Sequence, residues 1–117
     1  MNKEPLIFIE HILESIEKIK LYAENFTKAQ LTKDAKIQDA IIRRIEVIGE
    51  AAKNLQNDFK NRDPEVKWSE IIRTRDKITH HYFGIDLDVV WGILKKDIPI
   101  LEKQMFAIKE KLNKSPK

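Results

Sequence analysis

The 117-residue sequence has no cysteine and only three glycines, and these absences exclude several classes of function. Without cysteine, disulfides and thiolate chemistry are impossible, which is consistent with a reducing cytosol. Glycine occurs only at positions 49, 84 and 92. Neither a phosphate-binding P-loop nor a dinucleotide-binding fingerprint can be assembled from glycines so far apart.

A long uncharged hydrophobic run is also missing. The apolar stretch Leu6–Ile9 near the N-terminus is interrupted by Glu10 and His11. It is therefore too short for a signal peptide, and shorter still than a membrane span. We expect a cytoplasmic protein that does not associate with a membrane.

Histidine is scarce, and its positions do not suggest a metal site. His80 and His81 are adjacent, so on a helix they would point about 100° apart. The sequence has no His-x-x-x-His and no Glu-x-x-His pair. Glu46 and Glu50 share a helical face but lack the histidines of a di-iron bundle, so pairing with Arg43 or with a base on another helix is expected. We expect no metal and no cofactor in the protein itself.

Charge gives weak guidance about partners. The chain has 22 basic and 19 acidic residues, a net charge of +3 that is typical of solvated helix faces. The densest basic stretch, residues 60–77, is interrupted by four acidic residues, Asp63, Glu65, Glu70 and Asp76. If RNA binds here, local geometry must supply the positive field.

What the sequence does contain is helical periodicity. Apolar residues recur at three- and four-residue steps from about 5 to 23, 34 to 59, 68 to 82 and 86 to 112. Pro5 suits the first turn of a helix, and Asp34 and Asp86 (or Asp88) are expected N-caps. The polar connection at 25–33 has room for one short turn. We expect a single domain over 1–117, an all-α, four- to five-helix up-down bundle, with residues 113–117 frayed.

Three residues should interrupt or shape these helices. Gly84 is expected to cap the third helix near Tyr82, and Pro99 should kink the last helix because it cannot donate to the Lys95 carbonyl. Gly49 lies inside the second helix at a cost of about 1 kcal/mol relative to alanine. Either another backbone approaches closely there, or Gly49 is a small surface residue; the sequence leaves both open.

Residues 73–82 are the best candidate for chemistry, since they hold two of the three histidines, three basic residues and a tyrosine. Arginine offers a planar fork of donors to phosphate oxygens. Histidine exchanges protons near neutral pH, so it can take one from a ribose 2′-OH or give one to a leaving oxygen. A structural alternative stays open, in which Arg75 forms a salt bridge and His80 lies at a helix C-terminus.

The spacing of these residues sets a geometric condition. On an ideal helix Arg75 and His80 diverge by about 140°, whereas Tyr82 returns to nearly the face of Arg75. Convergence on one phosphate needs the last turn to loosen near His80, or a second copy of the segment. A symmetric dimer could place two copies of Arg75 and His80 around one cleft.

The segment from Arg75 to Tyr82 resembles a motif of a known family. An arginine, four spacers, a histidine, one spacer and a tyrosine are the pattern of HepT-like toxins in the HEPN superfamily. The segments Phe83–Leu87 and Ile42–Ala51 are also similar to the family, as is Trp68, and the likeness runs from about residue 6 to 108.

The resemblance implies a dimeric, metal-independent endoribonuclease, the toxin of a type VII-like toxin–antitoxin pair, with tRNA one candidate substrate. By position, Arg75 and His80 would be the catalytic pair, with Asp76 and His81 in supporting roles. Tyr82 would receive AMP from ATP, transferred by a cognate MntA-like nucleotidyltransferase antitoxin. The added phosphate would put negative charge into a cleft built for RNA phosphate.

Two positions depart from the family pattern, and two other functions stay open. Thr79 stands where an aliphatic residue is usual, and His81 where a small residue, commonly glycine, is usual. One alternative is a non-catalytic helical adaptor that presents Tyr82, or a nucleotide-binding surface, to a nucleotidyltransferase. The other is a bundle used only for assembly, with the arginine–histidine cluster serving the structure.

Overall fold

A computed structural model describes residues 4–80 and 84–114, and most of them are helical. The helices are α1 (Pro5–Ala23), α2 (Lys28–Lys33), α3 (Ala35–Asn54), α4 (Asn57–Asn61), α5 (Trp68–Ile72), α6 (Thr74–Ile78), α7 (Leu87–Gly92), the π-helical η1 (Ile93–Asp97) and α8 (Ile98–Lys114). Two-residue strands, β1 (Thr79–His80) and β2 (Gly84–Ile85), pair antiparallel between α6 and α7. The all-α class expected from the sequence is confirmed.

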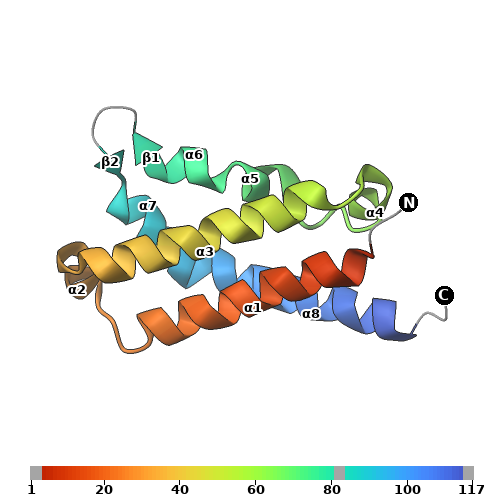
Figure 1. Cartoon of the computed structure of the whole chain (residues 1–117), viewed down its shortest axis with the longest axis horizontal. Helices are drawn as coiled ribbons and strands as arrows, with labels where there is room; N and C mark the ends of the chain where they lie inside the picture. Colours follow the sequence, from red (N-terminus) through yellow and green to blue (C-terminus); the bar gives the residue numbers. More distant parts are fainter. Residues whose placement is uncertain (1–3, 81–83, 115–117) are drawn as a thin grey trace.

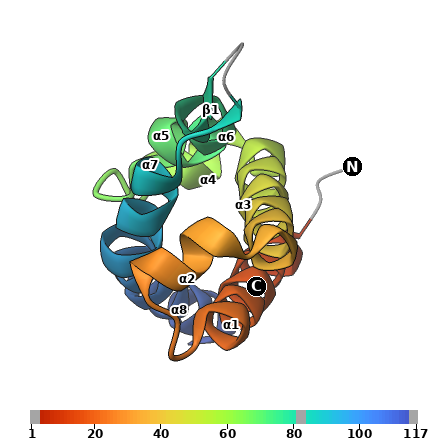
Figure 2. The same cartoon turned by 90° about the vertical axis from the view of Figure 1, so that its left-hand side faces the viewer.

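Four helical segments run in alternating directions around one core: α1, α3, α5 with α6, and α7 with η1 and α8. α1 lies along α3, its most extensive partner, and α8 lies along α1. α5 and α6 cover the other side of α3 (Figure 1). Seen from the end, the segments surround a common centre (Figure 2), which is filled mainly by aliphatic side chains of α1, α3 and α8. Among the described residues no helix is long and apolar enough to cross a membrane.

Three helices begin where the sequence predicted, because the residues that start or cap them act locally. Pro5 occupies the first position of α1, where no N–H is needed. The backbone N–H of Ile37 donates to Asp34 Oδ1 at 3.0 Å and caps α3, and that of Val89 donates to Asp86 Oδ1 at 3.2 Å and caps α7. The short turn expected in the polar connection is α2.

The second helix ends earlier than its apolar pattern predicted. α3 stops at Asn54, and the extended backbone of Leu55 (φ −70°, ψ 141°) leads into the separate helix α4. Leu55 and Phe59 are both buried nevertheless. The apolar spacing therefore continues across the break, because α4 turns Phe59 back into the core.

The predicted extent of the third helix, from Trp68 or Ser69 to about Tyr82, is wrong. The chain breaks at Arg73 into α5 and α6, and α6 ends at Ile78 rather than near Tyr82. The backbone N–H of Asp86 donates to the Ile78 carbonyl at 2.7 Å. In a longer helix the Ile78 carbonyl would accept from a backbone N–H one turn later. Here it accepts from Asp86 instead, and the helix ends. Gly84 lies in β2 and caps no helix.

The sequence predicted a kink at Pro99, and the structure has a π-helical turn, η1, directly before it; the kink itself stays a prediction. Ile98 donates its backbone N–H to the Ile93 carbonyl, five residues back, and α8 then begins. Because η1 continues directly into α8, Pro99 lies inside a continuous helical stretch rather than at a free helix start. α8 continues to Lys114, so the fraying predicted from Asn113 is wrong for these two residues. Residues 115–117 lie outside the described part.

Candidate functional site

A backbone contact at Gly49 fixes α5, and with it the segment that carries the candidate chemistry. A Cβ built on Gly49 would lie 3.3 Å from the Ile72 carbonyl oxygen and 3.4 Å from that of Ile71. Of the two readings of Gly49 left open by the sequence, close approach of another backbone is the correct one. Because α5 lies directly on α3, α6 follows beside the same helix.

The predicted catalytic pair falls on two different elements. Arg75 is the second residue of α6, and His80 is the second residue of β1, paired with Gly84. Since the helix ends at Ile78, the divergence calculated for one continuous helix does not apply. The loosening near His80 that the sequence required is present in the backbone. The side chains of Arg75 and His80, and all of His81 and Tyr82, lie outside the described residues, so their convergence stays a prediction.

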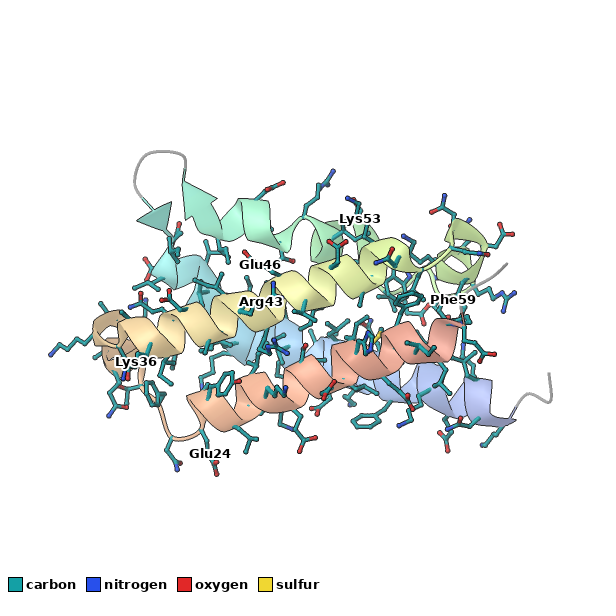
Figure 3. The ribbon with its side chains drawn as sticks, viewed as in Figure 1. Glu24, Lys36, Arg43, Glu46, Lys53 and Phe59 are labelled. Atoms are coloured by element: carbon teal, nitrogen blue, oxygen red, sulfur yellow. The ribbon has the colours of Figure 1, made fainter. Side chains whose placement is uncertain are left out.

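A groove runs along α3 beside this segment, with residues of α1 lining it on one side of that helix and residues of α5 and α6 on the other. We name it the α3–α6 groove. Its charged and aromatic lining comprises Phe8, His11, Arg43, Glu46, Glu50, Lys53, Arg73 and Asp76. Figure 3 shows Arg43, Glu46 and Lys53 following one another along α3. The exposed Asp76 is the one predicted site residue whose side chain is described, and it lines the groove.

Opposite charges balance along the α3–α6 groove. The described lining has three basic side chains, Arg43, Lys53 and Arg73, and three carboxylates, Glu46, Glu50 and Asp76. Arg43 Nη1 lies 3.8 Å from Glu46 Oε1, so the pairing expected for these two residues is confirmed. The described part of the lining therefore supplies no general positive field, and we expect an anion to be bound here by individually placed donors.

No three histidine, aspartate or glutamate side chains gather as metal ligands would among the side chains that the structure describes, which do not include that of His80. The metal-independent chemistry expected from the sequence stays a prediction.

Two residues of the groove were missed by sequence reasoning, Phe8 and His11 of α1. Their ring centroids lie 6.4 Å apart and their planes meet at 84°, an edge-to-face arrangement. One signal was present in the sequence, since His11 is a polar residue three positions after an aromatic one in a predicted helix. That they line the same groove as residues of α5 and α6 could not be read from that spacing.

Comparison with known proteins places this bundle in a family. Residues 12–108 match the family model HepT-like, described as ribonuclease HepT-like. The chain is 44% identical over 114 residues to "Probable ribonuclease HepT" of Thermococcus cleftensis, a match that covers 97% of this chain and 100% of that protein.

A second relative is longer. A Methanocaldococcus jannaschii protein, whose name combines gamma-glutamylcyclotransferase and putative RNase, is 43% identical over 115 residues. The match covers 98% of this chain and 52% of the relative, so the chain spans about half of that protein. No solved structure matches.

The fold and these similarities define a helical bundle of the HEPN type. The chain belongs to the HepT-like ribonuclease family. The resemblance drawn from residues 75–82, 42–51 and 83–87 is confirmed at the level of the family.

Proposed function

We propose that this protein is a metal-independent endoribonuclease in which Arg75 and His80 act on one RNA phosphodiester. Membership of the HepT-like ribonuclease family carries the proposal, together with the spacing of these two residues in the sequence. The backbone supports it, because α6 ends at Ile78 and His80 is released from the helical register of Arg75.

The chemistry needs a donor and a proton acceptor at the same linkage. The Arg75 guanidinium donates to the non-bridging phosphate oxygens and stabilises the charge that grows in the transition state. The His80 imidazole takes the proton of the adjacent 2′-OH, and the 2′-oxygen attacks phosphorus. The bond to the 5′-oxygen of the next nucleotide breaks, a proton passes to that oxygen, and a 2′,3′-cyclic phosphate remains.

A homodimer supplies the second proton-transfer group. A two-fold axis beside α6 would bring two copies of Arg75 and His80 to one cleft, so that one imidazole acts as base and the other as acid. His81 adds a further imidazole beside the cleft, and Asp76 on the groove side of α6 orients neighbouring donors. Protein of this kind acts in the cytoplasm, where its RNA substrates, tRNA among them, are found.

Control of the nuclease is assigned to Tyr82, in a type VII-like toxin–antitoxin pair. A cognate MntA-like nucleotidyltransferase would transfer AMP from ATP to the Tyr82 hydroxyl, with pyrophosphate as the leaving group. The negative phosphodiester on Tyr82 would repel RNA phosphate and fill the cleft, because the residue stands two positions after His80.

Cleavage of RNA by the purified chain tests the proposal. Wild-type protein should cut RNA in the presence of a chelator, whereas Arg75→Ala and His80→Ala should lose cleavage with an unchanged circular dichroism spectrum. Lys77→Ala is the matched control, because the exposed Lys77 lies on the same helix but lines a different hollow. If both variants cut as fast as wild type, the proposed mechanism is wrong.

Intact-mass measurement distinguishes the adaptor alternative. Incubation with the nucleotidyltransferase and ATP should add AMP to wild-type protein but not to Tyr82→Phe. Modification of Tyr82 without any RNA cleavage by wild-type protein would favour the helical adaptor over the nuclease.

A further inference from the structure

Two surface grooves meet at Phe8 and Asn54. The α3–α6 groove has both residues in its lining, and so does a second groove beside α4. The second groove is lined by Pro5, Phe8, Asn54, Leu55, Gln56, Asp58, Phe59 and Arg62. The shared residues join the two grooves into one path from Asp76 at α6 to Arg62 after α4, which we name the Phe8 path.

Planar side chains recur along the Phe8 path. His11 is exposed and meets the half-buried Phe8 edge to face, with 6.4 Å between the ring centroids. Beyond them, the Arg62 guanidinium lies 5.9 Å from the centroid of the Phe59 ring. Phe8 packs against the core and Phe59 is part of it. The two aromatic rings that contact His11 and Arg62 are therefore held in place.

The lining does not favour a protein partner on this path. The centre of a protein–protein interface is usually rich in apolar side chains that are exposed before binding. Among the described residues, the large exposed apolar side chains are Ile7, Leu21, Ile85, Ile100 and Phe106. None of these five lines either groove.

Among the side chains of the path that the structure describes, cations and carboxylates are equal in number. The four basic side chains are those of Arg43, Lys53, Arg62 and Arg73, and the four carboxylates are those of Glu46, Glu50, Asp58 and Asp76. Duplex RNA is bound chiefly through its phosphates and its shape, and calls for a more positive surface. Single-stranded RNA is bound by stacking its bases on aromatic rings and guanidinium planes, with fewer phosphate contacts.

We propose that the Phe8 path binds the single-stranded RNA that extends from the linkage being cut. One base stacks on the exposed face of the His11 imidazole, which Phe8 holds in place, and a second stacks on the Arg62 guanidinium. Asn54, exposed at the junction of the two grooves, donates to or accepts from a base edge between them. The inference rests on the proposed ribonuclease function, and it makes His11 a substrate-binding residue outside the predicted motif.

Binding of an RNA that cannot be cut tests the path directly. Anisotropy of a labelled, unstructured 2′-O-methyl oligonucleotide should report about tenfold weaker binding to His11→Ala than to the full-length wild type. His11→Phe should bind nearly as well as wild type, because it keeps a ring. Glu17→Ala is the matched control, since Glu17 is exposed on the same helix and lines neither groove. Equal binding by His11→Ala and wild type would overturn the proposal, and so would equally weak binding by the alanine and phenylalanine variants.

Substrate length separates this inference from the proposed function. His11→Ala and Arg62→Ala should lower kcat/KM for a long single strand and leave cleavage of a dinucleotide unchanged. Cleavage by wild type with no effect of either variant would refute the path and leave the nuclease standing. RNA binding through His11 without cleavage would refute the nuclease and support the path. Loss of the dimer in His11→Ala, measured by sedimentation, would identify the groove as an interface between copies and would also overturn the path.

Discussion

The carbonyl oxygen of Ile72 lies 3.3 Å from the point that a Cβ on Gly49 would occupy, so α3 and α5 meet through their backbones. A backbone carbonyl cannot swing aside as a long side chain can. The position of α5, and of the motif that follows it, therefore depends on the absence of a side chain at residue 49.

Gly49→Ala should lower RNA cleavage and give no gain in stability. The better helix propensity of alanine, about 1 kcal/mol, is offset by the contact with Ile71 and Ile72. Gly92→Ala is the control, because no described atom beyond its chain neighbours and the adjacent backbone of its own helix lies within 4 Å of its Cβ position, and it should raise stability by about 0.4–1 kcal/mol. Thermal unfolding and cleavage rate are the measurements. Equal stabilisation by both substitutions would show that the contact at Gly49 is not restrictive.

Arg75→Lys should reduce cleavage by about 10²-fold or more while the protein stays folded. Lysine keeps the positive charge but loses the planar fork that binds two phosphate oxygens together. Arg73→Lys is the matched control on the neighbouring exposed position, and its effect should be small. Single-turnover rates measure both. Full activity of Arg75→Lys would mean that a point charge suffices, against the bidentate role assigned to Arg75.

RNA binding should depend only weakly on salt. The described lining of the groove carries balanced charges, so we expect few phosphate contacts, and for single strands each contact contributes about −0.7 to the slope of log K against log salt. Two to three contacts give a slope of about −1.4 to −2.1. Titrations of an uncleavable oligonucleotide at several salt concentrations measure it. A slope steeper than about −4 would indicate a more basic surface, such as one completed by a second protomer.

The pair of Asp63 and Lys111 should tie the loop before α5 to α8 over a wide pH range. Lys111 Nζ donates to Asp63 Oδ1 at 2.7 Å, and this hydrogen bond, followed by the charge of Asp63, raises the pKa of Lys111 above its ordinary value of 10.5. The folded state thus favours the protonated lysine. The resulting stabilisation is present below pH 10.5 and is lost as the pH rises through the raised pKa.

Lys111→Met should therefore lower thermal stability at neutral pH, because it leaves the buried Asp63 carboxylate without that partner. Lys114→Met is its control, since Lys114 forms an exposed pair with Glu110 at 3.8 Å and should contribute little. Melting curves at neutral pH and at a pH beyond the raised pKa of Lys111 measure the difference. A gap between wild type and Lys111→Met that stayed constant at the higher pH would contradict the assignment.

Helix starts were predictable from the sequence because they depend on local chemistry. Pro5, Asp34 and Asp86 act within one turn of their own position, and each begins a helix as expected. Gly49 was recognised as unusual, but only the packed structure shows that α5 is the neighbour.

The ends of helices were less predictable because distant parts of the chain determine them. α3 stops before Leu55, although Leu55 and Phe59 continue the apolar pattern into the core. α6 stops at Ile78, whose carbonyl accepts a hydrogen bond from the backbone N–H of Asp86. The Phe8 path was missed for the same reason, since it joins residues of α1, α3 and α4 that no local pattern relates.

A double-mutant cycle on RNA cleavage tests the central claim most directly. Single-turnover rates are compared for wild type, Arg75→Ala, His80→Ala and the double variant on one RNA. If the guanidinium and the imidazole act together on one linkage, each single variant loses nearly as much activity as the double variant. Independent losses that multiply in the double variant, or full activity in either single variant, would contradict the account.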